Sequence, residues 1–540
     1  MPNVLSPADP PVKASHELAR PPLFFLLSLG LLHFWRWSYV YGSSDHDELI
    51  PQVLHRVDPS LFTRDWFVIS QSGSVTVRTT FVELLRLFGA VIPLPTAVML
   101  LHIVVLVAVC WTVWQLAYAF VPDTLGASFG TFLAVVLFPY WTLGANGLTS
   151  GILVPEYIAW ALALPAVWLF VKKKRLAAAL LLGLAGWMQI LVGIQTTAVL
   201  GLVALWEAAQ DRSNRAVGDA VVFGLVAAVV AAPIALPILL APPMEGPTVE
   251  GVSTFHALAR LRVPHHYLLF SFGAGAYLRF GLLVVAGIAA LWTQHRAGRG
   301  REATFVVRFL IVTGGILCAA TIFTEAVPVL FVAKLQLFKL TVWVSTMMSL
   351  FVGAWAAWAM PSTLREFGEW VLKRRTAGLI ATGVAAAATI VAVAIGFGPA
   401  ASRYRPVAYT TSDLSQVEGW ALTNTPEDAL FLIPPSNTTF RVHARRSVAV
   451  NFKPTPYQRG GIDVWLNRTL AVAPMPVPEN GRGFKEALDD AYAANDETDW
   501  HRLSQRFGAE WALVDAARTS SPPSARPAFR AGDWAVYRLH

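Results

Sequence analysis

Long apolar runs alternate with short polar segments along most of this chain. A helix that crosses the hydrocarbon core of a bilayer needs about 20 mainly apolar residues, and about eleven segments come close to that length. The predicted spans are 22–41, 95–119, 124–142, 153–171, 175–189, 192–207, 217–241, 276–293, 303–323, 340–360 and 377–397. The stretch 175–207 fits either one long tilted helix or two short helices broken near Gln189. The pattern therefore predicts a polytopic α-helical membrane protein.

The pattern changes near residue 400, where turn dipeptides and short alternating runs replace the long apolar segments. Runs of period two predict strands at 429–433, 447–452, 510–514 and 534–537. Helical spacing predicts helices at 412–422, 462–472, 483–494 and 499–507. We therefore expect a transmembrane domain over residues 1–399 and a small soluble α/β domain over residues 400–540.

Composition and charge agree with this class and suggest an orientation. The 540 residues are 55% hydrophobic and only 14% charged, whereas soluble domains carry about 25% charged residues. The net charge of +8 comes largely from short loops such as 172–175 and 296–301, which the positive-inside rule places in the cytoplasm. We expect a bacterial plasma-membrane protein with a cytoplasmic N-terminus, an extracytoplasmic C-terminal domain and no nucleic-acid partner.

The first predicted outer loop begins with the acidic motif Asp45-His46-Asp47-Glu48. Three carboxylates within four residues cannot enter hydrocarbon without a large cost, so they must lie in water or in a polar cavity. Apolar residues at helical spacing predict interfacial helices over 48–57 and 79–90. Asp47 and Glu48 could simply cap the first helix and favour its dipole. Asp45 or Asp47 could instead act as a general base or bind a divalent cation such as Mg²⁺ or Mn²⁺.

Basic residues are unusually frequent in the loops that are predicted to lie outside. The segment 255–267 contains Arg260, Arg262, His265 and His266. Guanidinium forks and imidazoles suit phosphate oxygens, although the same residues could contact lipid headgroups by snorkelling. Further candidates for an anion site are Lys334, Lys339 and Arg36, and His265 is a weaker candidate for a metal ligand. Glu156, at the start of the fourth span, either lines the same cavity or stabilises its own helix N-terminus.

Taken together, this layout resembles the C-type (GT-C) glycosyltransferases, integral membrane enzymes that use polyprenyl-phosphate-linked sugars. The resemblance rests on the Asp45–Glu48 motif, the two helices of the first outer loop, the basic loop Arg260–His266 and the C-terminal outer domain. The segments 58–61, 262–266 and 444–447 are similar to those of a divergent bacterial branch of such proteins.

The resemblance implies a transfer with inversion at the anomeric carbon and a site assembled from several loops. Asp45 or Asp47 would be the base or a metal ligand, Glu48 of the same motif would be a further catalytic residue, and His265 would be a further ligand if a metal is used. Glu156 would be the second acid, since Asn146 occupies the position nearest the family's acidic residue. Arg260 and Arg262, helped by Lys334 or Lys339, would bind the lipid phosphate. Arg445, Lys453 and Trp465 of the outer domain would face the acceptor, which is a glycan, a lipid or a protein.

The sequence is also compatible with three other functions. A lipid-linked glycan ligase or polymerase also needs outer arginines, but it does not need an Asp-rich first loop. A transporter or flippase should carry acidic residues or broken helices near the middle of the bilayer. A non-catalytic envelope-assembly protein could keep the fold without the chemistry.

Overall fold

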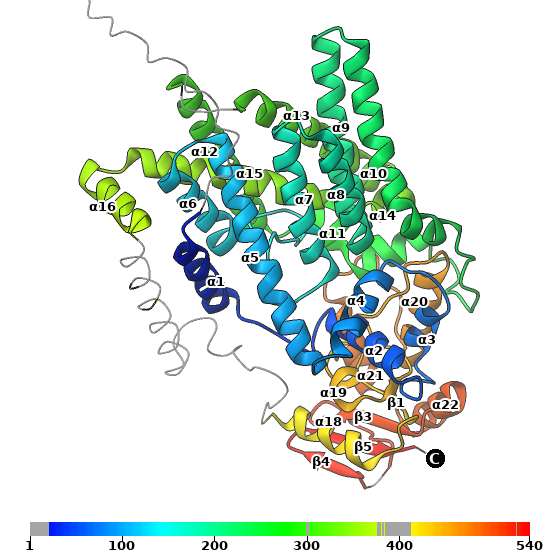
Figure 1. Ribbon diagram of the computed structural model, residues 1–540. Helices are drawn as coiled ribbons and strands as arrows, with labels where there is room; N and C mark the ends of the chain where they lie inside the picture. Colours follow the sequence, from blue (N-terminus) through cyan, green and yellow to red (C-terminus); the bar gives the residue numbers. More distant parts are fainter. Residues whose placement is uncertain are drawn as a thin grey trace, which may run out of the picture.

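The apolar runs form long helices that pack side by side, and a small sheet domain lies at one end of this bundle (Figure 1). The computed structural model describes residues 21–298, 302–374, 380, 383, 412–524 and 526–539. The predicted span 377–397 and the predicted domain boundary near residue 400 lie outside these described residues.

Each of the other ten predicted spans is a helix in the structure. Six helical segments are long and apolar enough to cross a membrane: Leu94–Phe120 (α5), Ile190–Gln210 (α9), Asn214–Leu240 (α10), Ala274–Arg296 (α12), Ala303–Ala326 (α13 to Thr321, then η4) and Leu330–Ala359. The last segment comprises α14 (Leu330–Lys334), η5 (Leu337–Leu340) and α15 (Thr341–Ala359). Four apolar helices are shorter: α1 (Leu23–Trp37), α6 with η1 (Thr124–Leu137), α7 (Pro155–Val171) and α8 (Arg175–Met188). α16 (Ser362–Lys373) follows α15.

Local sequence signals set several helix ends. Ser213 caps α10 by accepting a hydrogen bond from the amide of Ala216 at 3.2 Å, and Asp123 caps α6 through the amide of Gly126 at 3.1 Å. Between α8 and α9, Gln189 is extended, with φ −145° and ψ 103°. The stretch 175–207 is therefore two helices rather than one.

The segment between α1 and α5 contains three short helices: α2 (His46–Val57), α3 (Trp66–Ser72) and α4 (Thr79–Gly89). The two predicted helices are present, and their place at a membrane interface stays a prediction. Residues 46–53 are all buried, because α2 packs against α3, α4 and a helix of the C-terminal domain. α3 was not predicted; it begins where Asp65 accepts a hydrogen bond from the amide of Val68 at 3.0 Å.

The C-terminal domain is built on a five-stranded mixed sheet with the strand order β2-β1-β3-β5-β4. The strands are β1 (Leu430–Leu432), β2 (Ser447–Val448), β3 (Trp511–Asp515), β4 (Phe529–Ala531) and β5 (Trp534–Arg538), and the pairs of β1 with β2 and with β3 are parallel. The helices are α18 (Asp413–Asn424), α19 (Phe440–Ala444), α20 (Gly461–Val472), α21 (Phe484–Ala493) and α22 (Glu497–Phe507). The four predicted strands and four predicted helices are present, whereas α19 and the edge strand β4 were not predicted.

Alternation along the strands places one helical layer on each face of this sheet. Phe431 packs with α18 and α19, whereas Leu430 and Leu432 pack with α20, α21 and α22. The second core also contains residues 255–267, which form η2 (His256–Arg262) and α11 (Pro264–Tyr267), followed by η3 (Leu269–Ser271). The C-terminal domain therefore shares a hydrophobic core with a loop of the helical domain.

The contact between α6 and α15 depends on two glycines and gives a first testable prediction. A Cβ atom on Gly353 would lie 2.2 Å from the backbone nitrogen of Gly130. We expect Gly353→Ala to lower the thermal unfolding temperature of the purified protein, because overpacking costs about 1–3 kcal/mol. Gly314→Ala on α13 is the control, since an added Cβ there meets nothing within 4 Å. Equal shifts in the two variants would contradict this interpretation.

Candidate functional site

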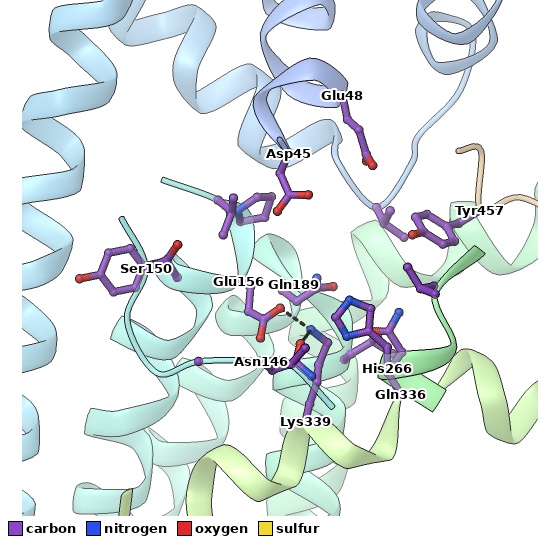
Figure 2. A pocket seen from close by; sticks show the side chains of 18 of the residues that line it. Asp45, Glu48, Asn146, Ser150, Glu156, Gln189, His266, Gln336, Lys339 and Tyr457 are labelled. Atoms are coloured by element: carbon purple, nitrogen blue, oxygen red, sulfur yellow. Dashed lines mark hydrogen bonds and ion pairs between the residues drawn. The ribbon is translucent and has the colours of Figure 1, made fainter. Parts of the chain in front are cut away.

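A cavity of about 480 Å³ lies where α2, the loop before α7, the 256–267 segment and the C-terminal domain meet (Figure 2). Its charged lining residues are Asp45, Glu48, Arg78, Glu156, Arg262, Lys334, Lys339 and Lys453. Its polar residues include Tyr140, Asn146, Gln189, His265, His266, Gln336 and Tyr457. Five cations face three carboxylates, so the lining carries a formal excess of two positive charges when the histidines are neutral. Such a cavity favours an anionic ligand.

Glu156 and Lys339 form the ion pair at the base of this cavity. Lys339 also donates a hydrogen bond to the side-chain oxygen of Asn146 at 2.8 Å, and Figure 2 shows the three side chains converging. Asn146 and Glu156 thus contact the same cation, although Asn146 lies in the middle of the loop that joins η1 to α7 and Glu156 lies in the first turn of α7.

Glu48 is held by two arginines. Arg78 donates from its Nε to Glu48 at 2.8 Å, and the nearest guanidinium nitrogen of Arg262 lies 3.9 Å from the other carboxylate oxygen. Arg262 is fixed further by a hydrogen bond of 2.9 Å to the hydroxyl of Thr455 and by the ring of Phe452, 4.7 Å away. Its guanidinium is therefore positioned before any ligand binds.

Asp45 immediately precedes α2 and forms an ion pair with Lys453 of the C-terminal domain. Burial alone would raise the pKa of Asp45, but the charge and hydrogen bond of Lys453 lower that pKa to about 2. The same contact raises the pKa of Lys453 against the opposing effect of burial. Asp45 is therefore ionised, and it is a weak base for as long as Lys453 stays beside it.

Two neutral histidines, His265 and His266, line the cavity beside these cations. Burial lowers the pKa of His265, and Arg262 and Lys453 lower it further. Burial and the neighbouring His265 hold the pKa of His266 well below its usual value. The Nδ1 of His266 lies 2.6 Å from the carbonyl oxygen of Gly144. This nitrogen therefore donates to that carbonyl, which fixes the neutral tautomer.

Asp47 does not line the cavity. It is fully buried on the other side of the α2 N-terminus, where Arg441 donates to it at 3.2 Å and Asn451 at 2.6 Å. Arg441 also donates to Asp65 at 2.7 Å, and Asp65 accepts from the amide of Val448 at 3.0 Å. We call Asp47, Asp65, Arg441 and Asn451 the interdomain cluster. It joins the segment before α5 to the C-terminal domain.

Four other residues that the sequence predicts for the site are also absent from the cavity lining: Arg36, Arg260, Arg445 and Trp465. The guanidinium of Arg36 stacks on Trp37 at 4.2 Å. The indole of Trp465 is buried and donates to the carbonyl of Asn451 at 3.1 Å. Arg445 follows α19 in a left-handed conformation, with φ 50°. Their roles in substrate binding stay predictions without a place in this cavity.

The predicted metal ligands are not gathered together. Asp45 pairs with Lys453 and Asp47 with Arg441. Within the described ranges, no group of three His, Cys, Asp or Glu side chains could hold a metal ion. A role for Mg²⁺ or Mn²⁺ stays a prediction.

Several lining residues carry no site signal in the sequence, including Tyr140, Gln189, Gln336 and Tyr457. Tyr140 fell within a predicted span, and Gln189 was noted only as a helix break. Gln336 donates to Tyr267 at 3.0 Å and adopts a left-handed φ of 47° before η5. No periodicity or motif marks these residues, because their proximity arises only from the fold.

One segment of the chain matches a protein-family model, and the fold is similar to that of a solved structure. Residues 412–472 match a family model described as a domain of unknown function (DUF6798). No curated protein matches the chain. The fold is similar to the apo form of the oligosaccharyltransferase of Archaeoglobus fulgidus, with 13% sequence identity, a TM-score of 0.48 and coverage of 92% of this chain and 69% of that chain. A likeness at this level carries no functional argument.

The interdomain cluster gives a second prediction. We expect Arg441→Met to destabilise the protein by about 3–5 kcal/mol, because it leaves the buried carboxylates of Asp47 and Asp65 without their cation. The control is Arg518→Met, which removes the exposed ion pair of Arg518 with Asp490, because the loss of a surface pair costs about 0–1 kcal/mol. Thermal unfolding of both variants in detergent checks the difference. A small effect in Arg441→Met would contradict the importance of this cluster.

Proposed function

We propose that this protein is a membrane glycosyltransferase that moves a sugar from a polyprenyl-phosphate-linked donor to a nucleophile on an acceptor. The observation that carries the proposal is the cavity at the end of the apolar helices, in which five cations outnumber three carboxylates. A ligand with an apolar tail and a phosphate head suits a positive cavity at the end of a bundle of apolar helices.

The donor phosphate would contact Arg262, Lys334 and Lys339, with the neutral His265 and His266 as hydrogen-bonding partners. Arg262 is positioned by Thr455 and Phe452, as described above. Among the described residues, Lys334 forms no ion pair, and the carboxylate of Asp463 acts on it only from a longer distance. Preorganised cations of this kind stabilise the charge that develops on a departing phosphate.

The proposed reaction is a single displacement at the anomeric carbon. The acceptor oxygen or nitrogen forms a bond to that carbon while the bond from the carbon to the phosphate oxygen breaks, and the polyprenyl phosphate leaves with the electron pair. The acceptor's proton passes to a carboxylate of the cavity. Each of the three carboxylates has a cation beside it, and Asp45 is the best candidate for this base because its pair with Lys453 is the most exposed of the three.

Binding of the lipid phosphate tests the first half of the proposal. We expect the purified protein to bind undecaprenyl phosphate, detected by native mass spectrometry, and Arg262→Met and Lys339→Met each to weaken binding about 10–100-fold. The estimate follows from about 1.5–3 kcal/mol for a hydrogen bond to a charged group and about 1.4 kcal/mol for each tenfold in affinity. Arg260→Met is the matched control, since Arg260 does not line the cavity. Equal losses in all three variants would contradict the assignment of the phosphate site.

Enzymatic turnover tests the proposed displacement and the role of Asp45 as its base. In membranes supplied with a panel of polyprenyl-phosphate sugars, we expect Asp45→Asn to reduce the conversion of donor to polyprenyl phosphate by about 10²–10⁴-fold, the usual contribution of a general base. Asp47→Asn should lower the yield of folded protein, whereas the rate per folded molecule stays close to that of the unaltered protein. Mass spectrometry of the lipids measures both rates. Full activity of Asp45→Asn would exclude Asp45 as the base.

A further inference from the structure

The part of the chain that matches the domain of unknown function reaches into the cavity. Residues 412–472 contain Arg441, Asn451, Lys453 and Tyr457, and the last two line the cavity. The cavity is therefore incomplete without the C-terminal domain, although Asp45 and Lys453, which meet in its lining, are 408 positions apart in sequence, a separation that no local pattern encodes.

Segment 45–47 pairs with segment 451–453 of the C-terminal domain, and every second residue of one segment contacts every second residue of the other. Asp47 accepts a hydrogen bond from Asn451, and two residues away along each segment Asp45 pairs with Lys453. The chain continues to Thr455, whose carbonyl accepts from Arg78 at 3.1 Å and whose hydroxyl accepts from Arg262. We call residues 451–457 the strap. It follows one wall of the cavity and contacts both acidic and basic residues there.

The two ion pairs at this contact differ sharply in exposure. The side chains of Arg441 and Asp47 are each 1% exposed, whereas those of Lys453 and Asp45 are 28% and 40% exposed. Separating the first pair would leave unpaired charges in the protein interior, which costs several kcal/mol. Separating the second pair costs far less, because water and an incoming anion can reach both groups.

We propose that residues 412–472 form a docking module, which the interdomain cluster anchors on α2, and that its Lys453 exchanges Asp45 for the phosphate of the donor. The choice of phosphate as the ligand rests on the proposed function; the docking does not. When Lys453 turns to the phosphate beside Arg262, Asp45 loses its cation. Its pKa then rises toward its ordinary range, and it becomes a stronger base when the donor is in place. Lys453 thus has a dual role, as a phosphate ligand and as a positioning residue for the base.

Docking is tested without any ligand. Hydrogen–deuterium exchange of the full-length protein should show faster exchange over 46–57 and 447–457 in Arg441→Met than in the unaltered protein. Arg518→Met, which removes an exposed arginine of the same domain, should leave these segments unchanged. Protection of both segments in Arg441→Met equal to that of the unaltered protein would overturn the docking role, whatever the protein binds.

The role of Lys453 is tested with undecaprenyl phosphate as the probe. We expect Lys453→Met to weaken binding at least about tenfold, the effect of about 1.4 kcal/mol. Lys453→Arg should retain binding within a few-fold, and Lys485→Met, at an exposed lysine of α21, should match the unaltered protein. In the turnover assay, the acidic limb of the pH profile of kcat/KM, which reports the free enzyme, should move to higher pH in Lys453→Met, because Asp45 loses the cation that lowers its pKa. The acidic limb of kcat, which reports the donor complex, should stay in place, because Lys453 has already left Asp45 there. A purely structural role would move neither limb, and a pair of Lys453 and Asp45 that persists in the donor complex would move both.

The outcomes are separable. If the unaltered protein binds no undecaprenyl phosphate, the proposed function and the exchange by Lys453 both fail, and the exchange measurements still decide the docking. If the unaltered protein binds the lipid and Lys453→Met binds it equally well, the proposed function survives and the role of Lys453 is overturned.

Discussion

The buried guanidinium of Arg441 is the interaction on which the arrangement of this molecule depends. It lies between the carboxylates of Asp47 and Asp65, and Asn451 donates to the first of these. Taking three charges out of water is costly, and only a complete set of short hydrogen bonds offsets that cost. A partly docked C-terminal domain would keep the desolvation cost and lose the bonds. The cluster therefore favours one geometry and disfavours intermediate ones.

That single geometry is what creates the cavity. Docking places the strap against α2 and brings Lys453 to Asp45, while the shared core fixes the 256–267 segment that carries Arg262. In the cavity every carboxylate has a cation beside it, because an unpaired charge in a poorly solvated site would shift its pKa until it became neutral. The cations that exceed the carboxylates then favour an anionic ligand. The same requirement, that a poorly solvated charge has a partner of opposite charge, therefore applies to the interdomain cluster and to the cavity.

The sequence predicts what depends on neighbours along the chain. Apolar length and periodicity, which are local signals, located the longer helices from α1 to α15 and most of the C-terminal elements, but not the short α3, α11 and α14. The partner of Asp47 could not be predicted, because Arg441 lies 394 positions away and no periodicity links them. The burial of α2 was missed for the same reason: its polar face suggested water, whereas it contacts the polar groups of a distant domain. Edge strand β4 has only three residues, too short for an alternating pattern.

The acidic motif 45–48 and the basic segment 260–266 each place only some of their charged side chains in the cavity, and helical geometry explains why. Asp45 and Asp47 are two residues apart, as are Arg260 and Arg262, and residues at that spacing on a helix point to different sides. Only one member of each pair can therefore face a given cavity: Asp45 and Arg262 line it, whereas Asp47 and Arg260 do not. Spacing alone could have predicted the division, but the choice of member depends on which side the C-terminal domain covers. For the acidic motif that choice is made by Arg441, which draws Asp47 into the interior and leaves Asp45 to the cavity.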